Sequence, residues 1–495
     1  MKSVLVIGAG IGGIATAGRL AQAGYEVTVL EQNDRPGGRC NKLELGEHRF
    51  DVGPSLFLMP EVFAQTYEDL GERMADHLDL RRIDPTYHLH FQDGTTLLLS
   101  GDLHRLQTQL EAIEPGSFGG LLRYLVEGRR HYELSLERFV GRNFYTFFDE
   151  FNPANLPLLF QLKALVKHYD YIGNFFSDPK LKAAFTFQNM YLGLSPYEAP
   201  ATYSLLQYTE LADGVWFPVG GMYRIVESLV EIAEAHGATF VYDAPVEEIE
   251  VEDGRAVGVL LDSGERVAAD VVIANADLPY VYDQLLPDED LAERVMEKEF
   301  TCSAIMFYWG VTARYPELAH HNVFLSGDYK ASFDEIFKGH TLPEEPSFYI
   351  HVPNRTDPAA APETGDTVMV LVPVGSMRDE LADQDWEALR ARARRTVIER
   401  LEGIGVTGLE ASIAHEVSYI PPDWREQFSL ARGAAFGLGH NFTQVGYLRP
   451  HNRHSRYENV YFCGASTHPG TGVPLVLLSA GLIEERILAE QPPAR

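Results

Sequence analysis

The first 31 residues contain the pattern that most limits how this chain can fold. The apolar run from Ser3 to Ile7 predicts a parallel strand that is covered on both faces. A turn with the spacing G-x-G-x-x-G follows directly, with its glycines at Gly8, Gly10 and Gly13. A helical stretch over residues 14–23 and a second apolar strand come next. This order of strand, turn, helix and strand predicts a βαβ unit, and therefore a parallel sheet.

Each glycine of this turn has its own physical role. Gly8 permits the tight turn, Gly10 lets the backbone approach a pyrophosphate, and Gly13 lets the helix pack closely against the strand. The helix N-terminus adds partial positive charge at the same place. Glu31, at the end of the second strand, is positioned to accept hydrogen bonds from both ribose hydroxyls. The pattern predicts an adenine dinucleotide site; the alternative is a βαβ unit with only a structural role.

A second glycine pair favours FAD over a nicotinamide cofactor. The segment RPGGR at 35–39 follows Glu31 closely, and FDVGPSLF follows at 50–57. Together they resemble the second fingerprint of the FAD-dependent amine oxidase and carotenoid desaturase superfamily. Glycines flanked by arginines suit a loop that wraps a diphosphate, so we expect Gly38 and Arg39 to contact FAD. The alternative is a surface turn with two solvated arginines.

The C-terminal part of the chain contains another strand, turn and helix built from small residues. VYFCGA at 460–465 predicts a central strand, HPGTGVP predicts its turn, and Pro474 suits the first turn of a helix. If that helix N-terminus faces the flavin, its dipole favours negative charge on the reduced ring. A bulky side chain would clash with the ring, so Gly464, Gly472 and Val473 are expected beside it. An ordinary strand, turn and helix is the competing interpretation.

The middle of the chain supplies further strands of the same domain. DVVIAN at 270–275 predicts a buried strand, and in the flavoproteins that this chain resembles the backbone near Val246 contacts adenine. The predicted fold is α/β: a discontinuous Rossmann-like FAD-binding domain of the glutathione-reductase type, with a mixed-sheet and helical substrate domain. The expected FAD-binding parts are 1–90, 213–300 and 441–495, with a helical substrate and membrane-associating region at 91–212 and a second substrate part at 301–440.

Composition narrows the classes of partner and compartment. The chain has 495 residues and a formal net charge of −30, which argues against a nucleic-acid partner. The three cysteines lack CxxC spacing, so a reducing compartment is expected: Cys40, Cys302 and Cys463. The sequence starts directly with an apolar run, without a signal-peptide pattern, and no apolar run reaches the roughly 18 residues of a membrane span. We therefore expect a cytoplasmic protein that is peripherally associated with the membrane.

Nearly the whole length of the chain resembles the bacterial-type phytoene desaturases, also called carotenoid dehydrogenases. The segments that carry this resemblance are LEQNDRPGGR (30–39), FDVGPS (50–55), DGVWFPVGGM (213–222), LAHHNVF (318–324), SFYIHVPNRTDPAAAPE (347–363), YLRPHN (447–452) and GASTHPGTGVP (464–474). The resemblance implies an enzyme that introduces double bonds into a long polyene hydrocarbon such as phytoene. A hydride would go to flavin N5 and a proton would leave the neighbouring carbon. Quinone or oxygen would then reoxidise the flavin.

The resemblance supplies few catalytic side chains. Asp149, in FYTFFDEFNP, matches a functionally implicated Asp of some relatives, although their Arg three residues later is Asn152 here. A carboxylate at this place would stabilise a transient carbocation or accept the proton; the alternative is a helix cap. Arg449 is expected to pair with an Asp or Glu. Three histidines are further acid–base candidates, although histidines at such positions more often hold loops: His351, His451 and His468.

An aromatic-rich region offers a candidate membrane contact. Within it, LPLLFQLKALVKHYDY at 156–171 predicts a single amphipathic helix with Lys163 and Lys167 beside its apolar face. That face would contain Leu158, Leu159, Leu162, Leu165, Val166 and Tyr169. Such a helix suits a membrane surface and equally suits the lining of an apolar domain.

Other functions are possible on the same scaffold. They are a carotenoid cis–trans isomerase or polyene saturase, and a flavin amine oxidase, which would need an aromatic cage that the sequence does not reveal. A non-redox prenyl- or lipid-binding protein represents a different class. The intact N-terminal and C-terminal glycine-rich turns favour a retained flavin over this last class.

Overall fold

The apolar run at the N-terminus forms the central strand of a five-stranded parallel sheet. β1 (Ser3–Ile7) pairs with β2 (Glu26–Leu30) on one side and β13 (Val271–Ala274) on the other. β9 (Thr239–Val241) and β19 (Val460–Phe462) extend the sheet outward, also in parallel. The computed structural model describes residues 1–286 and 288–493. Because these strands come from the start, middle and end of the chain, the discontinuous α/β architecture is confirmed.

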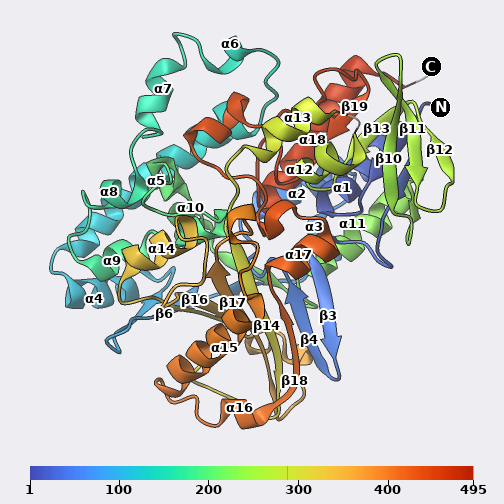
Figure 1. Ribbon diagram of the computed structural model, residues 1–495. Helices are drawn as coiled ribbons and strands as arrows, with labels where there is room; N and C mark the ends of the chain where they lie inside the picture. The colour runs from blue at the N-terminus through green and yellow to red at the C-terminus, as the bar shows by residue number, and fades with distance from the viewer. Residues whose placement is uncertain (287, 494–495) are drawn as a thin grey trace.

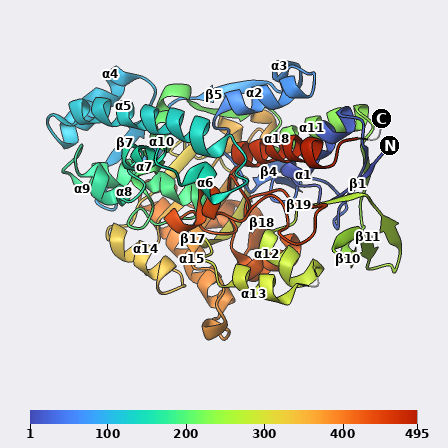
Figure 2. The ribbon, with the colours of Figure 1, turned by 90° about the horizontal axis from the view of Figure 1, so that it is seen from above.

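Both faces of the parallel sheet are covered, as the continuous apolar run of β1 requires. Val4 and Val6 pack in the core shared with α1 (Ile11–Gln22), α11 (Tyr223–Ala235) and α18 (Val473–Glu490). Leu5 and Ile7 face the opposite core, under the antiparallel sheet of β10 (Val246–Glu252), β11 (Arg255–Leu261) and β12 (Arg266–Ala268). Figure 2 shows α1, α11 and α18 side by side, and both views place the N- and C-terminal ends close together.

A second, seven-stranded sheet forms the base of the other domain (Figure 1). Its order is β18-β14-β17-β16-β15-β6-β7, and it is mixed, because β15 and β6 pair in parallel while its other pairings are antiparallel. α15 (Trp386–Glu402) packs on one face of it. The strand bounds are β6 Tyr87–His90, β7 Thr96–Leu99, β14 Ser303–Val311, β15 His321–Phe324, β16 Phe348–His351, β17 Asp366–Val374 and β18 Ile413–Tyr419.

Short helices cover the β6–β7 end of this sheet and share an aromatic core with it. The helices of this region are α4 (Leu103–Ile113), α5 (Ser117–Ser135), α6 (Phe147–Glu150), α7 (Leu156–Gln161), α8 (His168–Ile172), α9 (Pro179–Ala184), α10 (Leu205–Tyr208) and α14 (Tyr329–Phe337). The remaining elements are α2 (Pro60–Asp69), α3 (Met74–His77), α12 (Leu278–Tyr280), α13 (Glu289–Met296), α16 (Leu409–Ser412) and α17 (Pro421–Phe428), with the strand pairs β3 (Asn41–Leu45) and β4 (His48–Val52), and β5 (Leu80–Ile83) and β8 (Val215–Pro218).

The single helix predicted over residues 156–171 is wrong. α7 ends at Gln161, and Lys163 has a positive φ of 54°, which interrupts a right-handed helix. Lys167 then forms a β-bridge with Pro200 before α8 begins. The predicted apolar face is divided as a result: Leu162 is buried, whereas Leu165 is 67% exposed.

Candidate active site

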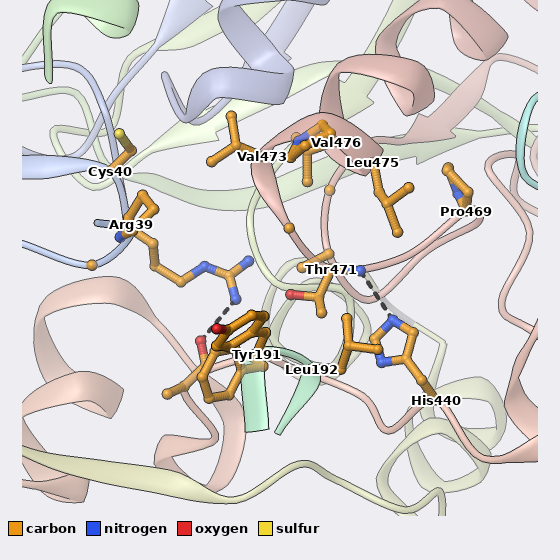
Figure 3. A pocket seen from close by; sticks show the side chains of 18 of the residues that line it. Arg39, Cys40, Tyr191, Leu192, His440, Pro469, Thr471, Val473, Leu475 and Val476 are labelled. Atoms are coloured by element: carbon orange, nitrogen blue, oxygen red, sulfur yellow. Dashed lines mark hydrogen bonds between the residues drawn. The ribbon is translucent and has the colours of Figure 1, made fainter. Parts of the chain in front are cut away.

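A continuous cavity runs from the edge of the parallel sheet into the helical region. Its volume is about 620 Å³. The N-terminal turn, through Gly10, and the C-terminal turn, through Gly472, both line it. Figure 3 shows part of the cavity, with Arg39 and Val473 on one side and Tyr191 on the other. Two glycine-rich turns separated by most of the chain therefore face the same space.

The N-terminal turn is built from backbone contacts that side chains would prevent. Gly8 has a φ of 96°, which favours glycine, and it lines the cavity together with Gly10. A Cβ on Gly13 would lie 2.2 Å from the carbonyl oxygen of Gly8. A Cβ on Gly10 would lie 2.7 Å from Oδ1 of Asn275, at the end of the neighbouring strand. Gly8 and Gly10 therefore form the cavity wall, whereas Gly13 allows α1 to pack behind it.

Glu31 lies at the cavity where β2 ends, with 4% of its surface exposed. Its Oε2 accepts a hydrogen bond from the Ala9 backbone N–H at 2.7 Å, and its Oε1 accepts one from Asn33 N–H at 3.0 Å. These bonds fix the carboxylate against the glycine turn. Oε1 accepts a second bond from Asn33 Nδ2 at 2.8 Å, so Oε2 is the oxygen that keeps acceptor capacity for the ribose hydroxyl expected from the sequence.

The second glycine loop packs directly on the first. Gly37 donates its N–H to the carbonyl of Ala9 at 2.7 Å, and both Gly37 and Gly38 have positive φ. Arg39 lies at the cavity and donates from Nη1 to the Ala435 carbonyl at 3.3 Å (Figure 3). Burial lowers the pKa of the Arg39 guanidinium, partly offset by the nearby Asp277 carboxylate.

The two arginines that flank this loop have different environments. Arg35 is partly exposed and forms an ion pair with Asp34, with 3.0 Å between Nε and Oδ1. Arg39 instead faces the enclosed cavity. The alternative of two solvated arginines describes Arg35 and does not describe Arg39.

The C-terminal turn brings a helix N-terminus to the cavity. Gly464 and Gly472 have φ values of 128° and 104°, and α18 begins at Val473. All three residues line the cavity, as does Val246 at the start of β10. The first N–H groups of an α-helix lack partners within the helix and carry partial positive charge. The end of α18 therefore offers donors to an electron-rich ring.

Two residues at the end of β13 connect these loops, and sequence reasoning did not identify either of them as part of the site. Asn275 donates from Nδ2 to the Cys463 carbonyl at 3.1 Å, while its Oδ1 faces Gly10. Asp277 accepts a hydrogen bond from Ser466 Oγ at 2.5 Å, and burial raises its pKa. Both line the cavity. Their position at the carboxyl end of a central parallel strand was the available signal.

Arg449 is fully buried, and its partners are backbone carbonyl groups where an Asp or Glu side chain is expected from the sequence. Its Nε donates to the Thr467 carbonyl at 2.8 Å, and its Nη1 donates to the carbonyls of Gly439 and Gln444 at 2.9 and 3.0 Å. It thereby holds the turn before α18 against the chain near residue 440. Burial lowers its pKa to about 10.

Two histidines that line the cavity, His440 and His468, are held in place by hydrogen bonds to the backbone and are uncharged at neutral pH. His440 accepts a hydrogen bond at Nε2 from the Thr471 N–H at 3.0 Å (Figure 3). Burial and the charge of Arg449 lower its pKa well below the usual value. His468 contacts the Arg142 carbonyl through Nε2 at 2.9 Å, and burial lowers its pKa to about 4. Both therefore act as structural hydrogen-bonding groups at neutral pH.

His351 belongs to a group of three buried histidines behind the cavity wall. Its Nε2 lies 3.1 Å from Nε2 of His320, and one ring nitrogen from each of these two and from His321 lies within 4.8 Å of the others. His321 Nδ1 contacts the hydroxyl of Tyr349, which lines the cavity. These spacings are within reach of one metal ion, but the positive charge of Arg355 acts on His320 and disfavours a cation. Neutral imidazoles joined by hydrogen bonds explain the contacts.

Asp149 lies outside the cavity wall, in the position of a helix cap. Its Oδ2 accepts hydrogen bonds from the N–H groups of Tyr145 and Thr146, at 2.7 Å each. These bonds to Thr146 and Tyr145 lower the pKa of Asp149. The next residue, Glu150, is the one that lines the cavity, and it accepts a hydrogen bond from the Tyr447 N–H. His451 is half-buried and contacts the ring of Tyr447.

Beyond the glycine loops, the cavity is lined mostly by apolar side chains of the mixed sheet and the helical region, with a few hydroxyl groups such as that of Tyr191. Its walls include Leu159, Leu162, Phe187, Met190, Leu205, Leu206, Val323, Leu325, Phe333 and Phe348. Such a surface binds an apolar molecule by shape and by exclusion of water.

Comparison with known proteins agrees with this geometry. Residues 11–482 match the family described as flavin containing amine oxidoreductase. The chain belongs to this family. It is 46% identical to a zeta-carotene-forming phytoene desaturase of Myxococcus xanthus over 489 residues, 98% of this chain and 94% of the relative. A phytoene desaturase of Fusarium fujikuroi is 42% identical, over 99% of this chain and 90% of that protein. The crystal structure of an oxidoreductase from Methanosarcina mazei aligns with a TM-score of 0.65 and 18% identity, over 98% of this chain and 100% of that chain.

Membership of this family makes the chain an FAD-dependent oxidoreductase. Its residues fit the cofactor. Gly10, Gly38 and Glu31 line one part of the cavity, where the sequence predicts the diphosphate and ribose, and the start of α18 lines it where the sequence predicts the ring. Over the part of the chain that the structure describes, none of the helices is both long enough and apolar enough to cross a membrane.

Proposed function

We propose that this flavoenzyme is a carotenoid desaturase, which introduces double bonds into a long polyene hydrocarbon such as phytoene. The observation that carries the proposal is the apolar part of the cavity, which opens directly onto the space between Arg39 and the start of α18. The names of the relatives that match almost the whole chain support the same activity.

The chemistry needs little from acidic or basic side chains at the ring. FAD, when bound, supplies a hydride acceptor at its N5 atom. The chain orients the polyene between apolar walls, excludes water, and places the N-terminus of α18 where negative charge is favoured. His440 and His468 stay uncharged, so they do not draw water or counter-ions into the cavity.

Expression in a host that accumulates phytoene tests the activity. We expect coloured, more unsaturated products in pigment extracts. The matched control is Gly472→Leu, in which a side chain enters the open space beside α18 where the ring is expected, and also strains the backbone at a φ of 104°. Phytoene that remains untouched by folded, flavin-loaded protein would contradict the proposal. Products that differ only in cis–trans geometry, or that are more saturated, would indicate an isomerase or saturase instead.

The protein is further proposed to work on the cytoplasmic surface of a membrane, where its apolar substrate dissolves. Its segment of residues 145–166, which we call the apolar rim, protrudes around α6 and α7 in Figure 1. The rim carries exposed apolar side chains while Leu159 and Leu162 of the same segment line the cavity. Those exposed side chains are Tyr145, Phe147, Phe148, Leu156, Phe160, Leu165 and Val166. A lipid-facing rim next to the cavity supports entry of the polyene from the bilayer.

Quinone dissolved in the same bilayer is the electron acceptor that this arrangement favours, with oxygen as the alternative. Anaerobic turnover in liposomes separates them. Continued desaturation with added quinone supports quinone, whereas turnover that requires air supports oxygen.

A further inference from the structure

Desaturation, as proposed above, releases a proton in an apolar cavity. Each new double bond requires loss of a hydride and of a proton from the neighbouring carbon. Once the hydride has left, that C–H bond is strongly acidic, so a weak base suffices. The histidines at the cavity are poorer recipients: His440 already uses its ring lone pair to accept the Thr471 N–H, and burial lowers the pKa of His468 to about 4. Besides the carboxyl groups of Glu150 and Asp277 at the cavity wall, the structure offers a further route for the proton.

Glu210 is a buried acid in the helical region, and no ion pair that includes it is found among residues 1–286 and 288–493. It lies in the π-helical turn Thr209–Asp213, with 2% of its surface exposed. Its hydrogen-bond donors are both neutral: Tyr87 and Gln188. Both carboxylate oxygens accept a hydrogen bond, Oε1 from Tyr87 and Oε2 from Gln188 at 3.0 Å. A carboxylate buried among neutral groups is costly to ionise, so this acid is poised to take up a proton.

Two tyrosine hydroxyls connect this acid to the cavity. Tyr87 is fully buried on β6 and donates to Glu210 Oε1 at 3.1 Å. Tyr191 donates its hydroxyl hydrogen to the Tyr87 hydroxyl and lines the cavity (Figure 3). Both donors point from the cavity towards the carboxylate. The Tyr191 oxygen keeps a lone pair with which it can accept a proton.

The surroundings of Glu210 allow it to change charge near neutral pH. Burial raises its pKa to about 7, although the hydrogen bonds from Gln188 and Tyr87 partly offset this rise. The facing groups that titrate are tyrosines: Tyr87 from β6, Tyr191 from the turn after α9, and Tyr124 from α5. Burial raises the pKa of each well above its usual value, so all three stay neutral hydroxyls. A neutral hydroxyl passes a proton on by accepting one while it donates another, which Tyr191 and Tyr87 are placed to do.

We propose that Tyr191, Tyr87 and Glu210 form a proton relay that accepts the proton lost from the polyene. The inference rests on the proposed desaturation. The C–H bond breaks and its electron pair forms the new C=C bond. The proton moves to the Tyr191 oxygen, the Tyr191 proton to Tyr87, and the Tyr87 proton to Glu210. Bound FAD would supply the hydride acceptor, and quinone or oxygen would finally receive the hydride and the proton. Tyr191 touches the substrate, and the other two act through it.

Three variants test the relay: Tyr191→Phe and Glu210→Gln interrupt it, and Tyr124→Phe is the matched control. Tyr124 belongs to the same buried network but lies beyond Glu210, donating to Gln207 at 2.9 Å. The measurement is anaerobic bleaching of bound FAD after mixing with phytoene in liposomes. We expect both relay variants to slow bleaching about 100-fold, the lower range for loss of acid–base catalysis, while the control keeps the wild-type rate. Wild-type rates in both relay variants would overturn the proposal.

The pH profile separates a relay from a structural role. Glu210 accepts a proton only when ionised, so the wild-type bleaching rate should rise through about pH 7 and level off above it. Tyr124→Phe should keep this profile, and Glu210→Gln should flatten it. A profile that Glu210→Gln leaves unchanged would overturn the role of this acid.

Infrared spectra of the protein without substrate distinguish failure of the relay from failure of the proposed function. We expect a protonated-carboxyl band that disappears as the pH rises through about 7 and is absent in Glu210→Gln. A wild-type protein with this band but without phytoene-dependent bleaching would contradict desaturation. Normal bleaching without the band would contradict the relay alone.

Discussion

At the scale of single residues, environment decides which of two similar side chains can serve the site. Asp149 and Glu150 are adjacent in sequence, but Asp149 caps its own helix and Glu150 lines the cavity. Arg35 and Arg39 flank the same glycine loop, and only Arg39 faces the cavity. At Gly13 the environment permits only glycine, because any Cβ there would meet the backbone of Gly8.

Replacement of Gly13 by alanine tests this packing. Its Cβ would lie 2.2 Å from the Gly8 carbonyl oxygen, so α1 must move away from the turn. We expect the free energy of unfolding to fall by about 1–3 kcal/mol, as for overpacked cores, and FAD affinity to fall at least about tenfold. Gly18→Ala is the control, because its Cβ meets the flexible Leu70 side chain at 3.3 Å, away from the cavity. FAD titration and denaturant unfolding measure both effects; unchanged FAD affinity in Gly13→Ala would contradict the assignment.

At the scale of elements, the segment from α6 to α8 shows how a periodic pattern can be broken by the backbone. The apolar spacing over residues 156–171 suits one helix, yet the left-handed conformation of Lys163 ends that helix early. The interruption sends Leu159 and Leu162 to the cavity and leaves Phe160 and Leu165 68% and 67% exposed. Some side chains of this stretch therefore line the cavity, and others lie on the outer surface of the protein.

Polar substitution of the apolar rim tests its contact with lipid. Phe148→Ser and Phe160→Ser together remove side chains that are 74% and 68% exposed, so folding should be unaffected. We expect the double variant to remain in the supernatant when liposomes are sedimented, while the wild type is retained. Leu381→Ser, at an exposed apolar residue 39% exposed in another region, is the control. Equal retention of the double variant and the wild type would exclude the rim as the membrane contact.

At the scale of the whole molecule, the cofactor site exists only where three distant segments of the chain meet. β1 and β2, β13, and β19 lie next to one another in a single sheet, and each contributes a loop to the cavity. Asn275 connects two of these loops, through Cys463 and the glycine turn. The net charge of −30 describes the whole chain and does not explain the site, which depends on these local contacts.

Binding of FAD should therefore stabilise the molecule as a unit. A ligand that binds only the folded state at about 100 times its Kd adds about 2.7 kcal/mol to the free energy of unfolding. We expect the thermal midpoint of flavin-free protein to rise when FAD is added, in one transition for both domains. Gly472→Leu, which obstructs the ring position, should lose part of this rise. A midpoint that does not respond to FAD would contradict convergence of the three segments on the cofactor.

The sequence by itself determined those features of the site that depend only on residues close together in the chain. The glycine spacings, Glu31 and the helix start at Val473 identify a flavin site because backbone geometry and short-range chemistry limit what such residues can do. Only the tertiary structure decided which side chains meet across the chain. Asn275, Asp277, Arg449 and the path from Tyr191 to Glu210 depend on contacts between elements far apart in sequence. A buried polar group depends on whichever partners the packed fold places beside it, and no short sequence pattern records them.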